Sequence, residues 1–175
     1  MRNFILIVAL LVGVLSIYTA KAADLPKFAL TTQAFPNAGA LPILYTCDGK
    51  DVSPDFAWTN PPAKTQTFAL VVTDPDAPNG TFYHWTLFNI PKDVAKLEAG
   101  ITQLPTGALV AKNSDGKSQY NGPCPPKGAT HTYIFTIYAL DSTLPLPESA
   151  DAKTVVSALN KHALQQTQLT AAYGR

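Results

Sequence analysis

The 175-residue sequence predicts a mainly β protein of the α+β class, with a mostly antiparallel sheet and helical structure only near its C-terminal end. Three observations predict this class. Only 14% of the residues are charged and 15 are prolines, which is typical of a compact, loop-rich β protein rather than a helical bundle. The strongest apolar segments alternate with a period of two. We find no internal repeat and no low-complexity linker, so we expect one domain.

Residues 1–22 have the features of an export signal. Arg2 gives a positive start, 4–17 is an almost unbroken apolar run, and Ala-Lys-Ala at 20–22 is a small-x-small cleavage pattern. The run is shorter than the roughly 20 apolar residues that span a bilayer. We therefore expect cleavage after position 22, a single mature domain at 23–175 with no integral membrane span, and a periplasmic or secreted location. An uncleaved membrane anchor is the alternative.

The charge distribution excludes nucleic acid as a partner. Removal of the signal would take away Arg2 and Lys21, which leaves eleven basic residues against twelve acidic ones. The sequence contains no basic block, and binding to nucleic acid requires clustered cations that neutralise phosphates.

Four segments have the pattern of strands. "KFALTT" at 27–32 alternates, and "QTFALVVTD" at 66–74, "FYHWTLFNI" at 82–90 and "HTYIFTIYALD" at 131–141 are rich in β-branched and aromatic residues. Pro- and Gly-rich loops separate them. The residues expected to share one face of each strand are Phe68, Leu70, Val72 and Asp74; His84, Thr86 and Phe88; and His131, Tyr133, Phe135 and Ile137.

Helical spacing occurs only after the last strand signal. Ser149 or Asp151 could cap a helix, and the residues that follow at helical spacing are Val155, Ala158, Leu159 and His162. We expect a second short helix through "ALQQTQLTAAY" at 163–173.

The chain has two cysteines, Cys47 and Cys124. In an exported chain a pair is expected to form a disulfide rather than to bind a metal ion, and two free, partly buried thiols are the alternative. The segment "DGKD" at 48–51 lacks the remaining ligands of a calcium loop, so we expect neither a metal ion nor a cofactor.

Titratable residues lie at the ends of three predicted strands. Asp74 ends one strand, His84 begins the next, and His131 begins another, two residues before Tyr133 on the same face. If these ends meet, the side chains line one cleft. The alternative is that the three residues are unrelated: Asp74 caps a turn, His84 is half-exposed, and His131 is a strand residue whose hydrogen bonds are made within the fold. The loop "NGPCPPKG" immediately before His131 favours the cleft, because its glycine allows close approach of a ligand and its prolines fix its shape.

Several ordered motifs resemble one known family. "DPDAP", then His84-Trp85, then "GPCPPKGATHTY" are similar to the phosphatidylethanolamine-binding protein family, also called Raf-kinase-inhibitor-like. "CDGKDVSPDFAW" and "AAYGR" resemble its bacterial branch. The resemblance implies a central antiparallel sheet, a second smaller sheet, C-terminal helices and a pocket for phosphate-like head groups.

The resemblance also implies the residues of that pocket. The ligand-binding positions that match the family motifs are Asp74, Asp76, His84, Gly122, Pro123, His131 and Tyr133. Thr132 departs from the arginine that the family usually has, and Phe82 stands where several animal members carry a pocket tryptophan.

We therefore expect an exported, non-catalytic protein that binds a small anion or a phospholipid head group. The alternative is an inhibitor or regulator of a secreted or periplasmic protein partner, such as a protease or kinase. A hydrolase with His84 or His131 as general base is less favoured, because no nucleophile is placed beside either histidine.

Overall fold

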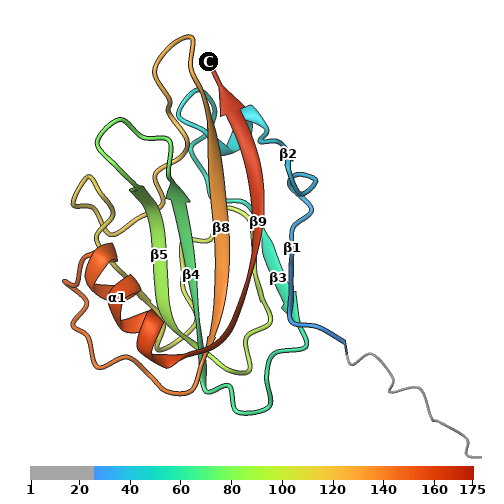
Figure 1. The fold of residues 1–175 in the computed structure, drawn as a ribbon, viewed down its shortest axis with the longest axis vertical. Helices are drawn as coiled ribbons and strands as arrows, with labels where there is room; N and C mark the ends of the chain where they lie inside the picture. The colour runs from blue at the N-terminus through green and yellow to red at the C-terminus, as the bar shows by residue number, and fades with distance from the viewer. Residues whose placement is uncertain (1–25) are drawn as a thin grey trace, which may run out of the picture.

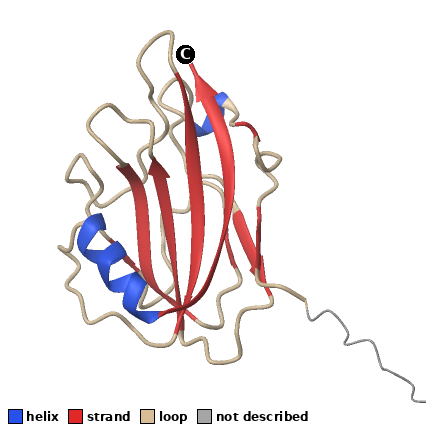
Figure 2. Ribbon diagram, in the orientation of Figure 1, coloured by secondary structure: helices blue, strands red, loops and turns tan. Residues whose placement is uncertain are grey.

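The computed structural model describes residues 26–175, so the signal expected at 1–22 lies outside the described residues. The described chain forms two β-sheets and one α-helix (Figures 1 and 2). The large sheet has the order β2 (Gly39–Ala40), β9 (Ala163–Gly174), β8 (Thr130–Leu140), β4 (Thr67–Asp74), β5 (Phe82–Pro91) and β7 (Leu109–Val110). The small sheet has the order β1 (Ala29–Thr31), β3 (Phe56–Thr59) and β6 (Lys96–Leu97). The helix α1 covers Ala152–His162, and a short 3-10 helix, η1, covers Ile43–Tyr45.

The expected fold class is confirmed, with a central sheet that is antiparallel except where β2 pairs with β9. The four predicted strands are present as β1, β4, β5 and β8. β4 is the centre of the large sheet and pairs antiparallel with both β5 and β8. All its residues except Thr73 are buried, because it is covered on both faces.

The second helix predicted at 163–173 is wrong, because this segment is the long strand β9. It pairs antiparallel with β8 from Thr130↔Gly174 to Leu140↔Ala163. Leu169 and Ala171 alternate inward and are buried. The Gln and Ala residues of the segment favour a helix, but pairing with β8 and burial of one face override that local preference.

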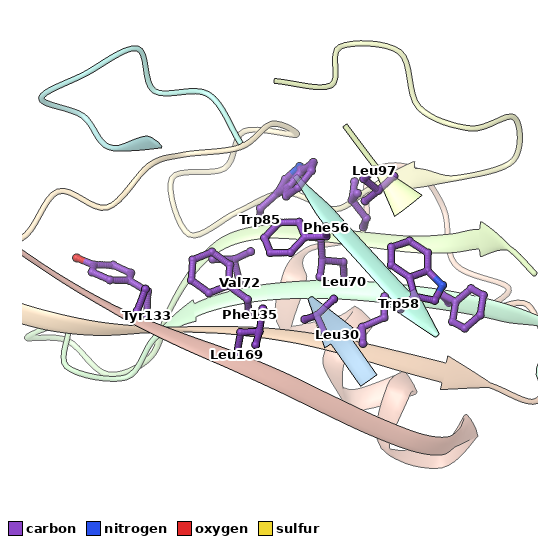
Figure 3. Packing of buried hydrophobic residues seen from close by; sticks show 14 of the residues in the cluster. Leu30, Phe56, Trp58, Leu70, Val72, Trp85, Leu97, Tyr133, Phe135 and Leu169 are labelled. Carbon is purple, nitrogen blue, oxygen red and sulfur yellow. The ribbon is translucent and has the colours of Figure 1, made fainter. Parts of the chain in front are cut away.

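Two apolar clusters flank the large sheet. Phe68, Leu70 and Val72 of β4 belong to the cluster between the sheets, together with Phe56 and Trp58 of β3 (Figure 3). Side chains on the other face of the large sheet form the second cluster with α1; its buried members include Ala69, Val71, Phe88, Val155 and Leu159. The large sheet is thus the middle layer, between the small sheet and the helix (Figure 1).

Of the two residues predicted to cap the helix α1, Asp151 is the N-cap. Its Oδ1 accepts a hydrogen bond from the Thr154 amide at 2.7 Å. The helix ends at His162, whose Nδ1 lies 3.1 Å from Oδ1 of Asp141. Across the described part of the chain, no helix has the length and apolar character needed to cross a membrane.

Candidate functional site

A cavity of about 320 Å³ lies where β4 ends and where β5 and β8 begin. These strand ends lie toward the upper end of the large sheet in Figure 1. The structure brings four of the predicted residues together in its wall: Asp74, His84, Gly122 and His131. Tyr133 packs against both histidines, with ring centroids 5.3 Å from His84 and 6.5 Å from His131. Tyr133 itself, Asp76 and Pro123 are not part of the cavity wall.

Asp74 orients His131 within the site. Oδ2 of Asp74 lies 2.7 Å from Nδ1 of His131, and their side chains are 6% and 9% exposed. Oδ1 of Asp74 accepts a hydrogen bond from the Asp76 amide at 2.8 Å. An ionised carboxylate only accepts hydrogen bonds, so Nδ1 of His131 carries a proton. This pairing fixes the ring and leaves Nε2 for a ligand.

A β-bulge directs His84 into the cavity. Val72 pairs with Trp85 but Thr73 pairs with Tyr83, so His84 is an extra residue on β5. The predicted grouping of His84 with Thr86 and Phe88 on one face is therefore wrong. Bulges often re-aim a side chain beside a functional site, and here the imidazole turns toward Tyr133.

His84 is buried and has one unpartnered ring nitrogen. Its Nδ1 lies 2.6 Å from the Asn121 carbonyl oxygen, and its Nε2 is buried with no hydrogen-bond partner. Because a carbonyl only accepts, Nδ1 carries the proton and Nε2 of the neutral ring is an acceptor. Burial lowers the pKa of His84, although the bond to Asn121 and the charge of Asp74 oppose this shift. The neutral ring is therefore the form present at neutral pH.

Tyr133 provides the opposite chemistry, a buried donor without a partner. Its side chain is fully buried and its hydroxyl makes no hydrogen bond. Figure 3 shows the hydroxyl pointing away from the apolar cluster. Burial, and then the charges of Asp74 and Asp76, raise the pKa of Tyr133 far above its ordinary value. The hydroxyl consequently keeps its proton and is available as a donor.

Gly122 lines the cavity, but its amide is already engaged. The amide donates to Oδ1 of Asp51 at 2.6 Å. A Cβ at this position would clash with the Asp51 carboxylate and would lie 2.7 Å from the Tyr45 carbonyl oxygen. Glycine is therefore required for close contact with the segment at 45–51. Because its amide hydrogen is already bonded to Asp51, Gly122 offers no backbone donor to a ligand.

The two remaining predicted residues hold the loops around the cavity. Oδ2 of Asp76 accepts a hydrogen bond from the Thr132 amide at 2.8 Å, which ties the loop after β4 to β8. Pro123 is buried, and its carbonyl accepts from the Cys47 amide at 3.2 Å.

Two further polar residues of the cavity wall, Asp115 and Asn121, were not predicted from the sequence. Nδ2 of Asn121 donates to Oδ2 of Asp115 at 2.9 Å. Asn121 begins the "NGPCPPKG" loop that favoured the cleft, but no pattern marks its side chain, and Asp115 lies in a segment without a motif. The wall contains two carboxylates and two imidazoles, and none of its described residues is a lysine or an arginine.

A disulfide joins Cys47 to Cys124. Both residues are exposed, and Cys124 is part of the cavity wall. Nη1 of Arg175 lies 3.1 Å from Sγ of Cys47 and 3.2 Å from Sγ of Cys124. Within 26–175, no group of three or more His, Cys, Asp or Glu residues is arranged to hold a metal ion.

Comparison with known proteins relates this chain to one family. A family model described as phosphatidylethanolamine-binding protein matches residues 31–174. A UPF0098 protein from Methanothermobacter thermautotrophicus is 40% identical over 149 residues, covering 83% of this chain and 98% of the relative. YbhB of Escherichia coli is 38% identical over 132 residues, covering 72% and 84%.

Solved structures agree with this relationship. The crystal structure of Escherichia coli YbcL, described as a new member of the mammalian PEBP family, matches with a TM-score of 0.82 and 31% identity, covering 86% of this chain and 99% of that one. A homologue from Chlamydia trachomatis matches with a TM-score of 0.78 and 31% identity, covering 85% and 97%. The chain therefore belongs to the phosphatidylethanolamine-binding protein family, in the bacterial branch that includes YbhB and YbcL.

Proposed function

We propose that the protein is an exported, non-catalytic binding protein whose cavity accepts a small anion or the phosphate-containing head group of a phospholipid. The observation that carries this proposal is the pair of buried, unpartnered polar atoms, Nε2 of His84 and the hydroxyl of Tyr133. Leaving such a group without a partner costs about 1–3 kcal/mol. A ligand that hydrogen-bonds to both atoms recovers that free energy.

The two atoms require complementary groups on the ligand. Neutral His84 accepts through Nε2, whereas Tyr133 donates. A singly protonated phosphate has a P–O–H group that donates to His84, and its other oxygens accept from Tyr133 and, when His131 carries a proton on both ring nitrogens, from Nε2 of His131. The proposed ligand is therefore a phosphate-like group that carries one proton.

The charges of the cavity wall favour the same form. Asp74 and Asp115 contribute carboxylates, and no lysine or arginine among the described wall residues offsets them. Like charges at short range disfavour a dianion. A monoanionic or zwitterionic head group is the better match, and an amine on the ligand could pair with the exposed Asp115.

Calorimetry with O-phosphoethanolamine near pH 6 tests the proposal. We expect measurable binding by the wild type and a loss of about tenfold in affinity in Tyr133→Phe, since a hydrogen bond to a charged group contributes about 1.5–3 kcal/mol. Tyr138→Phe is the matched control, because Tyr138 lies on the same strand but packs in the cluster beside α1. Absence of binding in the wild type, or equal losses in both variants, would contradict the proposal.

Export is supported by the signal-like pattern at 1–22 and by the exposed disulfide. Expression of the full chain in a Gram-negative host and fractionation of the cells tests it. We expect the protein in the periplasm with Ala23 as its first residue. Recovery of the intact N-terminus from the cytosol would contradict export.

A hydrolase is the second candidate, favoured by the buried Asp74–His131 pair. Such a pair could orient a general base. The described cavity wall has no serine, threonine or free cysteine, so water would have to be the nucleophile. Turnover of p-nitrophenyl phosphate by the wild type, lost in His131→Gln but retained in the distant His162→Gln, would support this candidate over simple binding.

A further inference from the structure

The disulfide lies in an unusual electrostatic setting. Both cysteines are exposed, and the guanidinium of Arg175 contacts both sulfur atoms through Nη1. The same nitrogen lies 3.1 Å from Oδ1 of Asp48, and the Tyr173 hydroxyl donates to Oδ2 of Asp48 at 2.6 Å. One cation and one anion therefore face the sulfur atoms, and the cation makes the direct contact.

This setting favours cleavage of the disulfide by an external thiol. A neighbouring arginine stabilises a thiolate, and thiol–disulfide exchange is faster and more complete when the leaving sulfur is a stable thiolate. Arg175 contacts whichever sulfur leaves. Asp48 acts in the opposite direction, because its negative charge disfavours a second negative charge nearby.

We propose that Cys47–Cys124 is an exchange site for a dithiol reductant and that its state controls the wall of the cavity. A thiolate of the reductant attacks one sulfur, forms a mixed disulfide and releases the other cysteine as a thiolate beside Arg175. The second thiol of the reductant then displaces the remaining cysteine. The reductant becomes a disulfide, and the protein gains two electrons, which reside on two cysteine sulfurs that are free to take up protons.

Other contacts keep the fold intact after reduction. The amide of Cys47 donates to the Pro123 carbonyl, the Gly122 amide to Asp51, and the Tyr120 hydroxyl to the Tyr45 carbonyl. These bonds hold the chain up to position 123. The Gly128 amide donates to the Arg175 carbonyl and holds the chain again from position 128. Between these two anchors Cys124, Pro125 and Pro126 form part of the cavity wall, so reduction frees this part of the wall without unfolding the sheets.

The first test measures the equilibrium between the purified protein and a dithiothreitol redox buffer. At a pH about one unit above the ordinary thiol pKa of about 8.5, where the thiolate is the populated form, we expect Arg175→Gln to lower the equilibrium constant for reduction by about tenfold, equivalent to one pKa unit of thiolate stabilisation. Asp48→Asn should raise it. Lys127→Gln, which removes an exposed cation of the same loop, should leave it unchanged. If Arg175 and Asp48 only clamp the loop, both variants would shift the constant in the same direction, and that result would overturn the proposal.

The second test follows the cavity by NMR of the three imidazoles and needs no ligand, so it is independent of the proposed binding function. Reduction should shift the resonances of His84 and His131, which line the cavity, and leave those of His162 beside α1 unmoved. The same shifts should appear in Cys47→Ser/Cys124→Ser without reductant. Unchanged resonances for His84 and His131 would show that the disulfide does not control the cavity and would overturn that part of the proposal.

Discussion

At the scale of single residues, the two cavity histidines are held in different ways. His131 is paired with the Asp74 carboxylate at 2.7 Å, whereas His84 is bonded to a neutral backbone carbonyl at 2.6 Å. A carboxylate stabilises an imidazolium much more strongly than a carbonyl does. The two rings are therefore suited to different parts of a ligand, His131 to an anionic oxygen and His84 to a donor.

Asp74→Asn should weaken the binding of O-phosphoethanolamine near pH 6 by about tenfold and leave the domain folded. The amide oxygen of Asn can still accept from the Asp76 amide, as Oδ1 of Asp74 does. The Asn NH2 group then faces Nδ1 of His131, so the charge-assisted bond to the carboxylate, which contributes about 1.5–3 kcal/mol, is lost and nothing stabilises the charged form of the ring. Calorimetry and urea unfolding measure the two effects. Normal affinity combined with lower stability would make Asp74 a turn residue only.

The lowered pKa of His84 gives a defined pH dependence. An unfolded histidine titrates near pH 6.5, whereas the buried ring takes up its proton at lower pH. The unfolded state therefore binds more protons as pH falls below about 6.5, and stability without ligand should decline there. Sulfate has no proton to donate to Nε2, so its binding requires protonation of His84. Its affinity should rise as pH falls through the same window.

Calorimetry with sulfate and thermal unfolding between pH 7.5 and pH 5 measure both trends. In His84→Gln the rise in affinity should be smaller, and the His162→Gln variant should behave as the wild type. A rise in affinity that is equally steep in His84→Gln would assign the titrating group to another residue.

At the scale of elements, the strands that could be predicted from the sequence are those whose own residues carry a clear strand pattern. β4 is a nearly continuous buried run, β8 alternates in its first half, and both are rich in β-branched and aromatic side chains. β9 was mistaken for a helix because its Gln and Ala residues have a helical preference, and because its partner β8 lies more than twenty residues earlier in every pair and does not influence the local pattern. The two-residue strands β2, β6 and β7 are too short for any pattern.

Asp151→Ala should lower the free energy of unfolding by about 1 kcal/mol, the usual effect of losing an N-cap. The lost bond is the one from the Thr154 amide to Oδ1 of Asp151. Ser149→Ala is the control, since Ser149 is exposed and is not the N-cap. Urea unfolding measures both variants, and an equal loss in the two would contradict the assignment of the cap.

At the scale of the whole molecule, the site forms where several segments far apart in the sequence meet. Asp74, His84 and His131 could be predicted because each lies at the end of a recognisable strand. Asp115 and Asn121 could not, since the path of their loop depends on tertiary bonds such as the one from the Ser114 amide to the Tyr83 carbonyl. The bulge at His84 could not be predicted either, because the sequence around it has the same pattern as a regular strand and the extra residue is evident only from the pairing with β4.

Loss of the disulfide should destabilise the molecule by about 4 kcal/mol in the chain-entropy model, because the bond closes a long loop. The two cysteines are 77 residues apart in the sequence. Guanidinium unfolding of Cys47→Ser/Cys124→Ser against the oxidised wild type measures the effect. A difference below about 1 kcal/mol would indicate that the denatured state already keeps these segments together.

The pairing of β4 with β8 also has a consequence for the kinetics of folding. The register joins Thr67 to Leu140 and Thr73 to Ile134, so the centre of the large sheet cannot form from local contacts. The long intervening segment must lose conformational entropy before the stabilising contacts between β4 and β8 can form. Proteins with such topologies therefore fold in milliseconds to seconds rather than microseconds. If the chain is exported as we propose, this delay lengthens the interval in which it is still unfolded and can be threaded through a translocation pore.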